Sequence, residues 1–153
     1  MRLSYIIAPV VILIAAFASV WILGLASGFE SVSLPEWLFS PGILAAVWGF
    51  AFFFGVAGIF TFWAVAPQTR RFRWALSIFI INIGLNILWM SALFGSQLIE
   101  VSLGISLALF LSVIVLIMII MPVAKLSSWL LVPYAGWTGF VAYLSYAILR
   151  LNR

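Results

Sequence analysis

The side chains that could carry out chemistry in this 153-residue chain are few. Histidine and cysteine are absent, and the only carboxylates are those of Glu30, Glu36 and Glu100, which stand near expected helix ends. Zinc sites, thiolate nucleophiles, imidazole acid–base catalysis, haem ligation by His or Cys and paired carboxylates are therefore excluded. Eight tryptophans remain, with scattered amides and hydroxyls. The chemistry that these groups offer is ring stacking and hydrogen bonding.

Three hydrophobic stretches place a tryptophan at helical spacing with groups that could contact a ligand. Residues three or four apart lie on one face of a helix. The three sets are Trp48, Phe52, Gly55, Val56 and Ile59; Asn82, Asn86 and Trp89; and Pro133, Trp137, Val141, Leu144 and Ile148. Because an amide is costly in hydrocarbon, we expect these faces to point into a helix bundle.

Each set also has a purely structural interpretation. Asn82 and Asn86 could act only as hydrogen-bonding groups between helices, worth about 0.6–2 kcal/mol each; we prefer this explanation for Asn82 and leave both open for Asn86. The gap at Gly55 could admit a neighbouring helix instead of a ligand. The expected convergence of Trp48 with two further indoles favours a ligand, because aromatic walls with a few polar groups suit a flat hydrophobic molecule.

The elements that carry these residues are expected to cross a membrane. Hydrophobic residues make up 67% of the chain and charged residues 7%, too few for the surface of a soluble domain. A spanning helix needs about 20 apolar residues. The prediction is an all-α, single five-helix transmembrane domain over 1–153, with spans of about 5–26, 42–66, 74–95, 98–121 and 127–149.

The connections between these spans differ in character. A lid loop is expected over 27–41, and the basic segment QTRRFR (68–73) is expected to be a hairpin before the third span. Ser127 or Ser128 is the expected N-cap of the last span. In the fourth span Gly104, Ala108 and Ser112 recur at four-residue spacing, which predicts close helix packing, either within the chain or in a homodimer.

Basic residues predict the orientation in the membrane. Five spans would place five of the seven basic side chains on the side of the N-terminus: Arg2, Arg70, Arg71, Arg73 and Lys125. The other side would hold Arg150, Arg153 and the three glutamates. By the positive-inside rule the N-terminus is expected to be cytoplasmic.

Three segments of the chain resemble the TspO/translocator protein family, also known as tryptophan-rich sensory proteins or peripheral-type benzodiazepine receptor homologues. These are LPEWLFSPG followed by Trp48, NIGLNILWMSALFG (82–95) and WLLVPYAGWTGFVAYLSYAILRLN (129–152). The resemblance covers roughly 34–152. It implies a five-helix membrane protein, often dimeric, that binds porphyrins and in some cases sterols or synthetic isoquinoline carboxamides.

The resemblance also implies which residues line the pocket. It places the pocket between the helices, under the first loop, with these ligand-binding residues: Trp37, Pro41, Trp48, Phe52, Asn86, Trp89, Trp137, Val141 and Ser145. The chain departs from the family pattern at three places. The loop reads Pro35 to Pro41 as PEWLFSP in place of Pro-x-Trp-x-Pro-Pro, Met90 stands where Ser is common, and Ser145 stands where many members have Asn.

Three functions follow as hypotheses. The first is a membrane receptor or carrier for a flat lipophile, a porphyrin (tetrapyrrole) foremost and a sterol second, held by stacking without a required cofactor or metal. The second is light- and oxygen-dependent porphyrin breakdown, with Trp48 and Trp137 as the oxidisable side chains. The third is a structural membrane subunit in which the tryptophans only pack. A channel is disfavoured because no span carries a continuous polar stripe.

Overall fold

The computed structural model describes residues 32–153, apart from the side chains of Pro41 and Ala45. Within this range the chain is helical and has no strand. The elements are α2 (Pro41–Val65), α3 (Arg70–Met90), the π-helix η2 (Ser91–Gly95), α4 (Ile99–Ile120), α5 (Lys125–Leu130) and α6 (Val132–Leu151). The all-α prediction is confirmed for these residues. The predicted first span, 5–26, and residues 27–31 of the predicted lid loop lie outside them.

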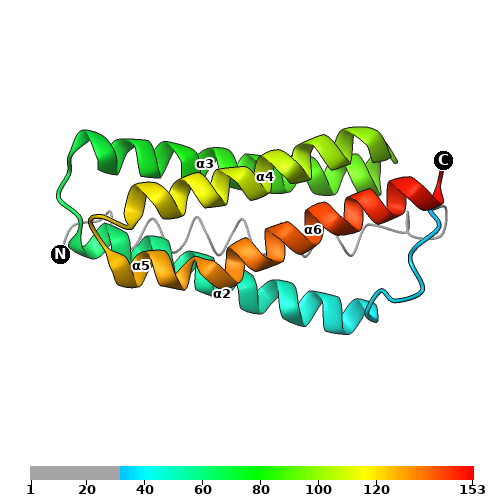
Figure 1. Cartoon of the computed structure of the whole chain (residues 1–153), viewed down its shortest axis with the longest axis horizontal. Helices are drawn as coiled ribbons and strands as arrows, with labels where there is room; N and C mark the ends of the chain where they lie inside the picture. Colours follow the sequence, from blue (N-terminus) through cyan, green and yellow to red (C-terminus); the bar gives the residue numbers. More distant parts are fainter. Residues whose placement is uncertain (1–31) are drawn as a thin grey trace.

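The helices run along a common long axis (Figure 1). α4 packs against both α3 and α6, while α2 packs against α5 and α6. The packed interior has two centres. One contains Trp48, Trp89 and Trp137, and the other contains Phe62, Phe72 and Leu116, nearer the α2–α3 connection. The C-terminal end of α6 and the loop before α2 lie at the same end of the bundle (Figure 1).

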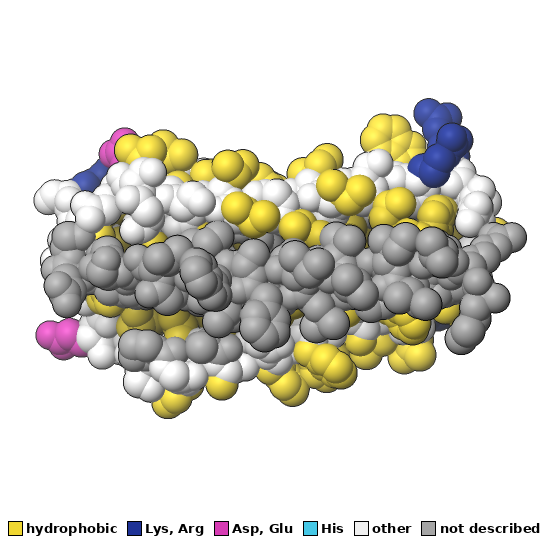
Figure 2. Space-filling view, turned by 180° about the vertical axis from the view of Figure 1, so that it is seen from behind, with side chains coloured by type: hydrophobic (Ala, Val, Ile, Leu, Met, Phe, Trp, Pro, Cys, Tyr) yellow, Lys and Arg dark blue, Asp and Glu magenta, His cyan; other side chains and the backbone are white. Residues whose placement is uncertain are grey.

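Three of the described helices are long and apolar enough to cross a membrane: Gly42–Val65, Arg70–Gly95 and Ile99–Ile120. Large aliphatic and aromatic side chains such as Phe53, Ile80 and Met118 are exposed along them. Figure 2 shows hydrophobic side chains along the middle of one face, with the visible charged side chains at its two ends. α6 is not among the three, because tryptophan, tyrosine and hydroxyl residues on it lower its hydropathy.

The third predicted span begins and ends differently from the prediction. The segment expected as a basic hairpin forms the start of α3, since Arg70 is the first helical residue. Thr69 caps the helix, with its hydroxyl oxygen accepting a hydrogen bond from the Phe72 N–H at 3.4 Å. The last predicted turn is the π-helix Ser91–Gly95. The second and fourth spans agree with α2 and α4 to within one residue at each end.

The predicted fifth span, 127–149, is wrong as a single helix. It is divided into α5 and α6, with Leu131 between them. Pro133 explains the division, because proline has no N–H to donate and its ring clashes with the carbonyl four residues earlier. The expected N-cap is also wrong: α5 begins at Lys125, and Ser127 and Ser128 are fully buried inside it.

Gly58 marks the closest approach of α2 to α5. A Cβ atom at this position would lie 2.9 Å from the Ser127 carbonyl oxygen and 3.0 Å from Cγ of Leu131. A Cβ at Gly49, in the same helix, would meet nothing within 4 Å. The contact at Gly58 is therefore one that only glycine permits without movement of the backbone.

We expect Gly58→Ala to lower the free energy of unfolding by about 1–3 kcal/mol, because the new methyl group must push α5 away. Gly49→Ala is the matched control. It should be neutral or stabilising by up to about 1 kcal/mol, since alanine favours the helix. Unfolding in a denaturing detergent titration measures both, and equal stability of the two variants would contradict the close approach.

Candidate ligand-binding site

Three indole rings from three helices meet inside the bundle. Trp48 of α2, Trp89 of α3 and Trp137 of α6 have exposed fractions of 7%, 5% and 8%, and they belong to one packed cluster. The rings of Trp48 and Trp137 are nearly parallel, 20° apart, with their centroids separated by 6.5 Å. The prediction that these rings face the interior of the bundle is confirmed.

Helical spacing explains why α6 presents Trp137 inward. Val141, Leu144 and Ile148 follow it at steps of four, three and four residues, and each of the three is at most 2% exposed. This stripe is the face of α6 that packs against α4 and α2. It places Trp137 within reach of Trp48 and leaves Tyr143 on the outer face, 58% exposed.

Trp89 is held by a hydrogen bond to α6. Its indole N–H donates to the Ser145 hydroxyl oxygen at 2.9 Å, and that hydroxyl donates to the Val141 carbonyl at 3.0 Å. Ser145 has no exposed surface. The pair therefore fixes the orientation of the Trp89 ring and joins α3 to α6 at the level of the indole cluster.

Trp48 differs from Trp89 because its indole N–H has no hydrogen-bond partner. The nitrogen is buried, and no acceptor lies within reach of it. A buried donor without an acceptor costs about 1–3 kcal/mol. Such a group is rare in a folded protein and calls for an explanation. At this position it is a donor, placed beside the flat face of Trp137, that an acceptor atom of a ligand would satisfy.

A hydrogen-bond network lies next to the indole cluster. The Tyr134 hydroxyl donates to Oδ1 of Asn82 at 2.7 Å and accepts from Nδ2 of Asn86 at 2.7 Å. Asn82 also donates from Nδ2 to the Ser112 hydroxyl oxygen at 2.7 Å, which connects α3 to α4. Asn82 thus has the interhelical bonding role that we preferred for it. Asn86 has the same kind of partner, so its predicted contact with a ligand stays a prediction.

Tyr134 is the residue that the sequence analysis did not include in the site. It is 3% exposed, and its ring faces Gly55, where a Cβ atom would come within 3.2 Å of Cγ of Tyr134. The gap expected at Gly55 is therefore filled by this ring. Phe52 makes an edge contact with it, at a centroid separation of 6.3 Å. The signal was available, because a tyrosine in a membrane helix needs a partner for its hydroxyl.

The described part of the predicted lid, residues 32–40, lies against the end of α6. Trp37 stacks on Tyr143 at 5.5 Å and makes an edge contact with Phe140 at 6.2 Å. Phe140 in turn contacts Trp137 at 5.4 Å. Trp37 is 46% exposed, so it reaches the indole cluster only through Phe140. Pro41, also predicted for the lid, is the first residue of α2.

The loop is fastened to α6 by one side chain. The Asn152 amide accepts a hydrogen bond from the Ser33 N–H and donates one to the Ser33 carbonyl, both at 3.0 Å. The loop and α6 border an open groove of about 500 Å³ that includes Trp37, Tyr143 and Arg150. Neither Phe140 nor Trp137 lines this groove, so it is separate from the indole cluster.

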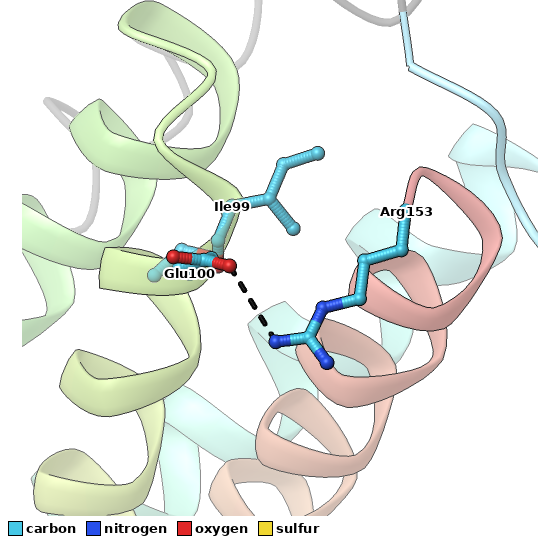
Figure 3. Close-up of polar contacts among 4 residues, drawn as sticks. Ile99, Glu100 and Arg153 are labelled. Atoms are coloured by element: carbon cyan, nitrogen blue, oxygen red, sulfur yellow. Dashed lines mark hydrogen bonds and ion pairs between the residues drawn. The ribbon is translucent and has the colours of Figure 1, made fainter.

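Charge contributes little to the site. Arg153 forms an ion pair with Glu100 at 3.5 Å, joining the end of α6 to the start of α4 (Figure 3). Both side chains are at least two-thirds exposed, so the pair adds no more than about 1 kcal/mol. Among the described residues, no group of three or more His, Cys, Asp or Glu could hold a metal ion. The indole cluster therefore offers aromatic faces and neutral hydrogen-bonding groups.

The apolar spanning helices define an integral membrane protein whose interior is built on tryptophan. The family model of the TspO/MBR family matches residues 6–151, nearly the whole chain. The chain belongs to this family, and the resemblance found in the sequence is confirmed.

Three relatives bear the name tryptophan-rich protein TspO. The one from Archaeoglobus fulgidus is 34% identical over 118 residues, which is 77% of this chain and 72% of the relative. The one from Chlorobaculum tepidum is 29% identical with the same coverage. The one from Bacillus cereus is 27% identical over 128 residues, 81% of this chain and 80% of the relative.

Removal of the Tyr134 hydroxyl tests the network. We expect Tyr134→Phe to lower the free energy of unfolding in detergent by about 1–3 kcal/mol, because it removes two interhelical hydrogen bonds and leaves two amides without their partner. Tyr143→Phe is the control, because Tyr143 lies on the outer face of α6. A loss of the same size in both variants would show that the hydroxyl of Tyr134 has no special role.

Proposed function

We propose that this membrane protein is a receptor or carrier that binds a flat lipophilic ligand at the indole cluster, with a porphyrin as the first candidate and a sterol as the second. The carrying observation is the buried and unpartnered indole N–H of Trp48. It lies in a wall of aromatic rings that a flat ring system could stack on. Porphyrin binding is also what the family resemblance implies.

The contacts support a division of roles among the proposed ligand-binding residues. Trp48 would donate a hydrogen bond to an acceptor such as a porphyrin carboxylate, and Trp137 would stack on the ring. Trp89 is already bonded to Ser145, so these two would shape the wall while Val141 packs behind them. Trp37 would shield the cluster from outside through its contact with Phe140.

We propose, further, five membrane spans and a homodimer. The first span would be formed by residues 5–26, and α5 with α6 would cross together as the fifth span, interrupted at Leu131. Gly104 and Ala108 of α4 are exposed, which leaves a surface of small residues suited to close contact with a second copy. Ser112 of the same stripe instead packs within the chain, where it bonds to Asn82.

Substitution of Trp48 tests the ligand-binding proposal. Trp48→Phe keeps an aromatic ring but removes the N–H donor together with the five-membered ring of the indole. We expect the dissociation constant for protoporphyrin IX to rise about threefold to tenfold, as for loss of one hydrogen bond. In the unliganded variant, the lost contacts of the buried ring and the relief of the unsatisfied donor oppose each other, so stability should change by less than about 2 kcal/mol. Titration followed by porphyrin absorbance and tryptophan quenching measures the affinity, and thermal unfolding measures the stability.

The control for this experiment is Trp129→Phe, since Trp129 is 66% exposed and lies in α5. It should leave the affinity unchanged. If Trp48→Phe and Trp137→Ala both bound protoporphyrin as tightly as wild type, the tryptophans would serve packing alone and the structural-subunit hypothesis would hold. Weaker binding together with a loss of stability greater than about 2 kcal/mol in Trp48→Phe would argue for simple loss of packing.

The proposed orientation places the end that carries Arg70, Arg71, Arg73 and Lys125 in the cytoplasm. The natural absence of cysteine allows a direct test. We expect a cysteine at Gln68 to react with an impermeant maleimide only after the cells are opened, and a cysteine at Ser96, at the other end, to react in intact cells. Gln68 and Ser96 are both exposed. The reverse pattern of labelling would invert the proposed topology.

A further inference from the structure

A basic hollow lies at the start of α3, at the end of the bundle away from the indole cluster. It has a volume of about 250 Å³ and is lined by Arg70, Arg73, Trp74 and Ser77. Steps of three and four residues bring the four side chains to one face of the helix. Figure 2 shows dark blue Lys and Arg side chains projecting at one end of the molecule, beside the hydrophobic surface.

No described residue provides an acidic partner for the guanidinium groups in this hollow. Among the described residues, the one ion pair is that of Arg153 with Glu100. Glu100 begins α4 at the opposite end of the bundle, and Glu36 lines the groove at the C-terminal end of α6. Arg70 and Arg73, with Arg71 between them, therefore form a cluster of like charges. A phosphate would relieve this repulsion, because guanidinium binds phosphate through paired charge-assisted hydrogen bonds.

The surface next to the hollow indicates what carries the phosphate. Trp74 is 56% exposed, and the next large apolar side chains exposed along α3 are Ile80 at 60% and Ile81 at 57%. Seven residues separate Arg73 from Ile80, about 10 Å along the helix axis. The order of cationic, aromatic and aliphatic groups matches the order of headgroup, interface and acyl chain in a phospholipid. A free phosphate ion would make no contact with the aliphatic side chains of Ile80 and Ile81.

The residues that line the hollow indicate the charge of the lipid headgroup that would bind there. Among the described residues no carboxylate lines the hollow, and its two guanidinium groups would repel the ammonium of a zwitterionic lipid. We propose that this hollow is a binding site for an anionic phospholipid, with Arg70 and Arg73 on the phosphate, Ser77 donating to it, and the acyl chain along Ile80 and Ile81. The site is separate from the indole cluster and does not depend on the function proposed for it.

Native mass spectrometry of the delipidated full chain in detergent tests this site. Dioleoyl phosphatidylglycerol and dioleoyl phosphatidylcholine, which share their acyl chains, are the probes. Wild type should bind phosphatidylglycerol more tightly. Arg70→Gln with Arg73→Gln should weaken that binding on the order of 20- to 30-fold, as for loss of two basic contacts, and weaken the binding of phosphatidylcholine less, because the ammonium of that lipid already offsets part of its attraction to the two arginines. Ser77→Ala, which keeps every charge, should weaken phosphatidylglycerol binding by about 2- to 5-fold.

The matched control is Arg71→Gln with Lys125→Gln, which removes the same charge from two exposed side chains outside the hollow. It should change the affinity for phosphatidylglycerol by less than twofold. Equal losses in the two double variants would overturn the proposal, because they would indicate a diffuse surface field. It would also be overturned if wild type did not prefer phosphatidylglycerol, or if glycerol 3-phosphate displaced the lipid at equal concentration. Thermal unfolding in detergent checks that the variants remain folded.

Discussion

The structure depends on one constraint: polar groups inside a membrane bundle must find their partners within the protein. α6 meets this constraint most visibly, because it carries both the Tyr134 hydroxyl and the Ser145 hydroxyl on its buried side. Each of them bonds to α3, through Asn82 and Asn86 in the first case and through Trp89 in the second. The position of α6 relative to α3 is thus fixed by directional bonds as well as by apolar packing.

The indole N–H of Trp48 is an exception to this constraint. Trp89 and Trp48 have the same chemistry and nearly the same burial, yet one N–H is bonded and the other is not. Among the described residues the hydroxyl of Ser127, in α5, is also buried without a partner, but only the N–H of Trp48 lies within the indole cluster. The unsatisfied group is a cost to the unliganded protein, and a ligand with an acceptor at that point would recover it. This asymmetry is what the proposed ligand-binding role of the cluster explains.

Helical periodicity was enough to predict which faces are buried. Trp137 and the apolar residues after it lie inside because they recur at three- and four-residue steps, and the same holds for Trp48 and Trp89. The break at Leu131 was not predicted, because an apolar window averages over Pro133. The start of α3 was not predicted, because the three arginines of segment 68–73 were interpreted as part of a polar connection. Exposed arginines are nevertheless compatible with the first turn of a helix. The hydrogen-bond partner of Tyr134 could not be predicted from the sequence, because that partner, Asn82, lies 52 residues earlier in the chain.

The clamp between Asn152 and Ser33 has a consequence for biogenesis. The two residues are 119 positions apart, so the ribosome releases the loop long before it makes the side chain that secures it. At typical synthesis rates of 5–20 residues per second, the delay is about 6 to 24 s. For most of that interval Trp37 also lacks its ring contacts with Tyr143 and Phe140. The loop before α2 can therefore reach its final position only after α6 has been made. Packing of the loop against α6 is thus a late step in the maturation of the protein.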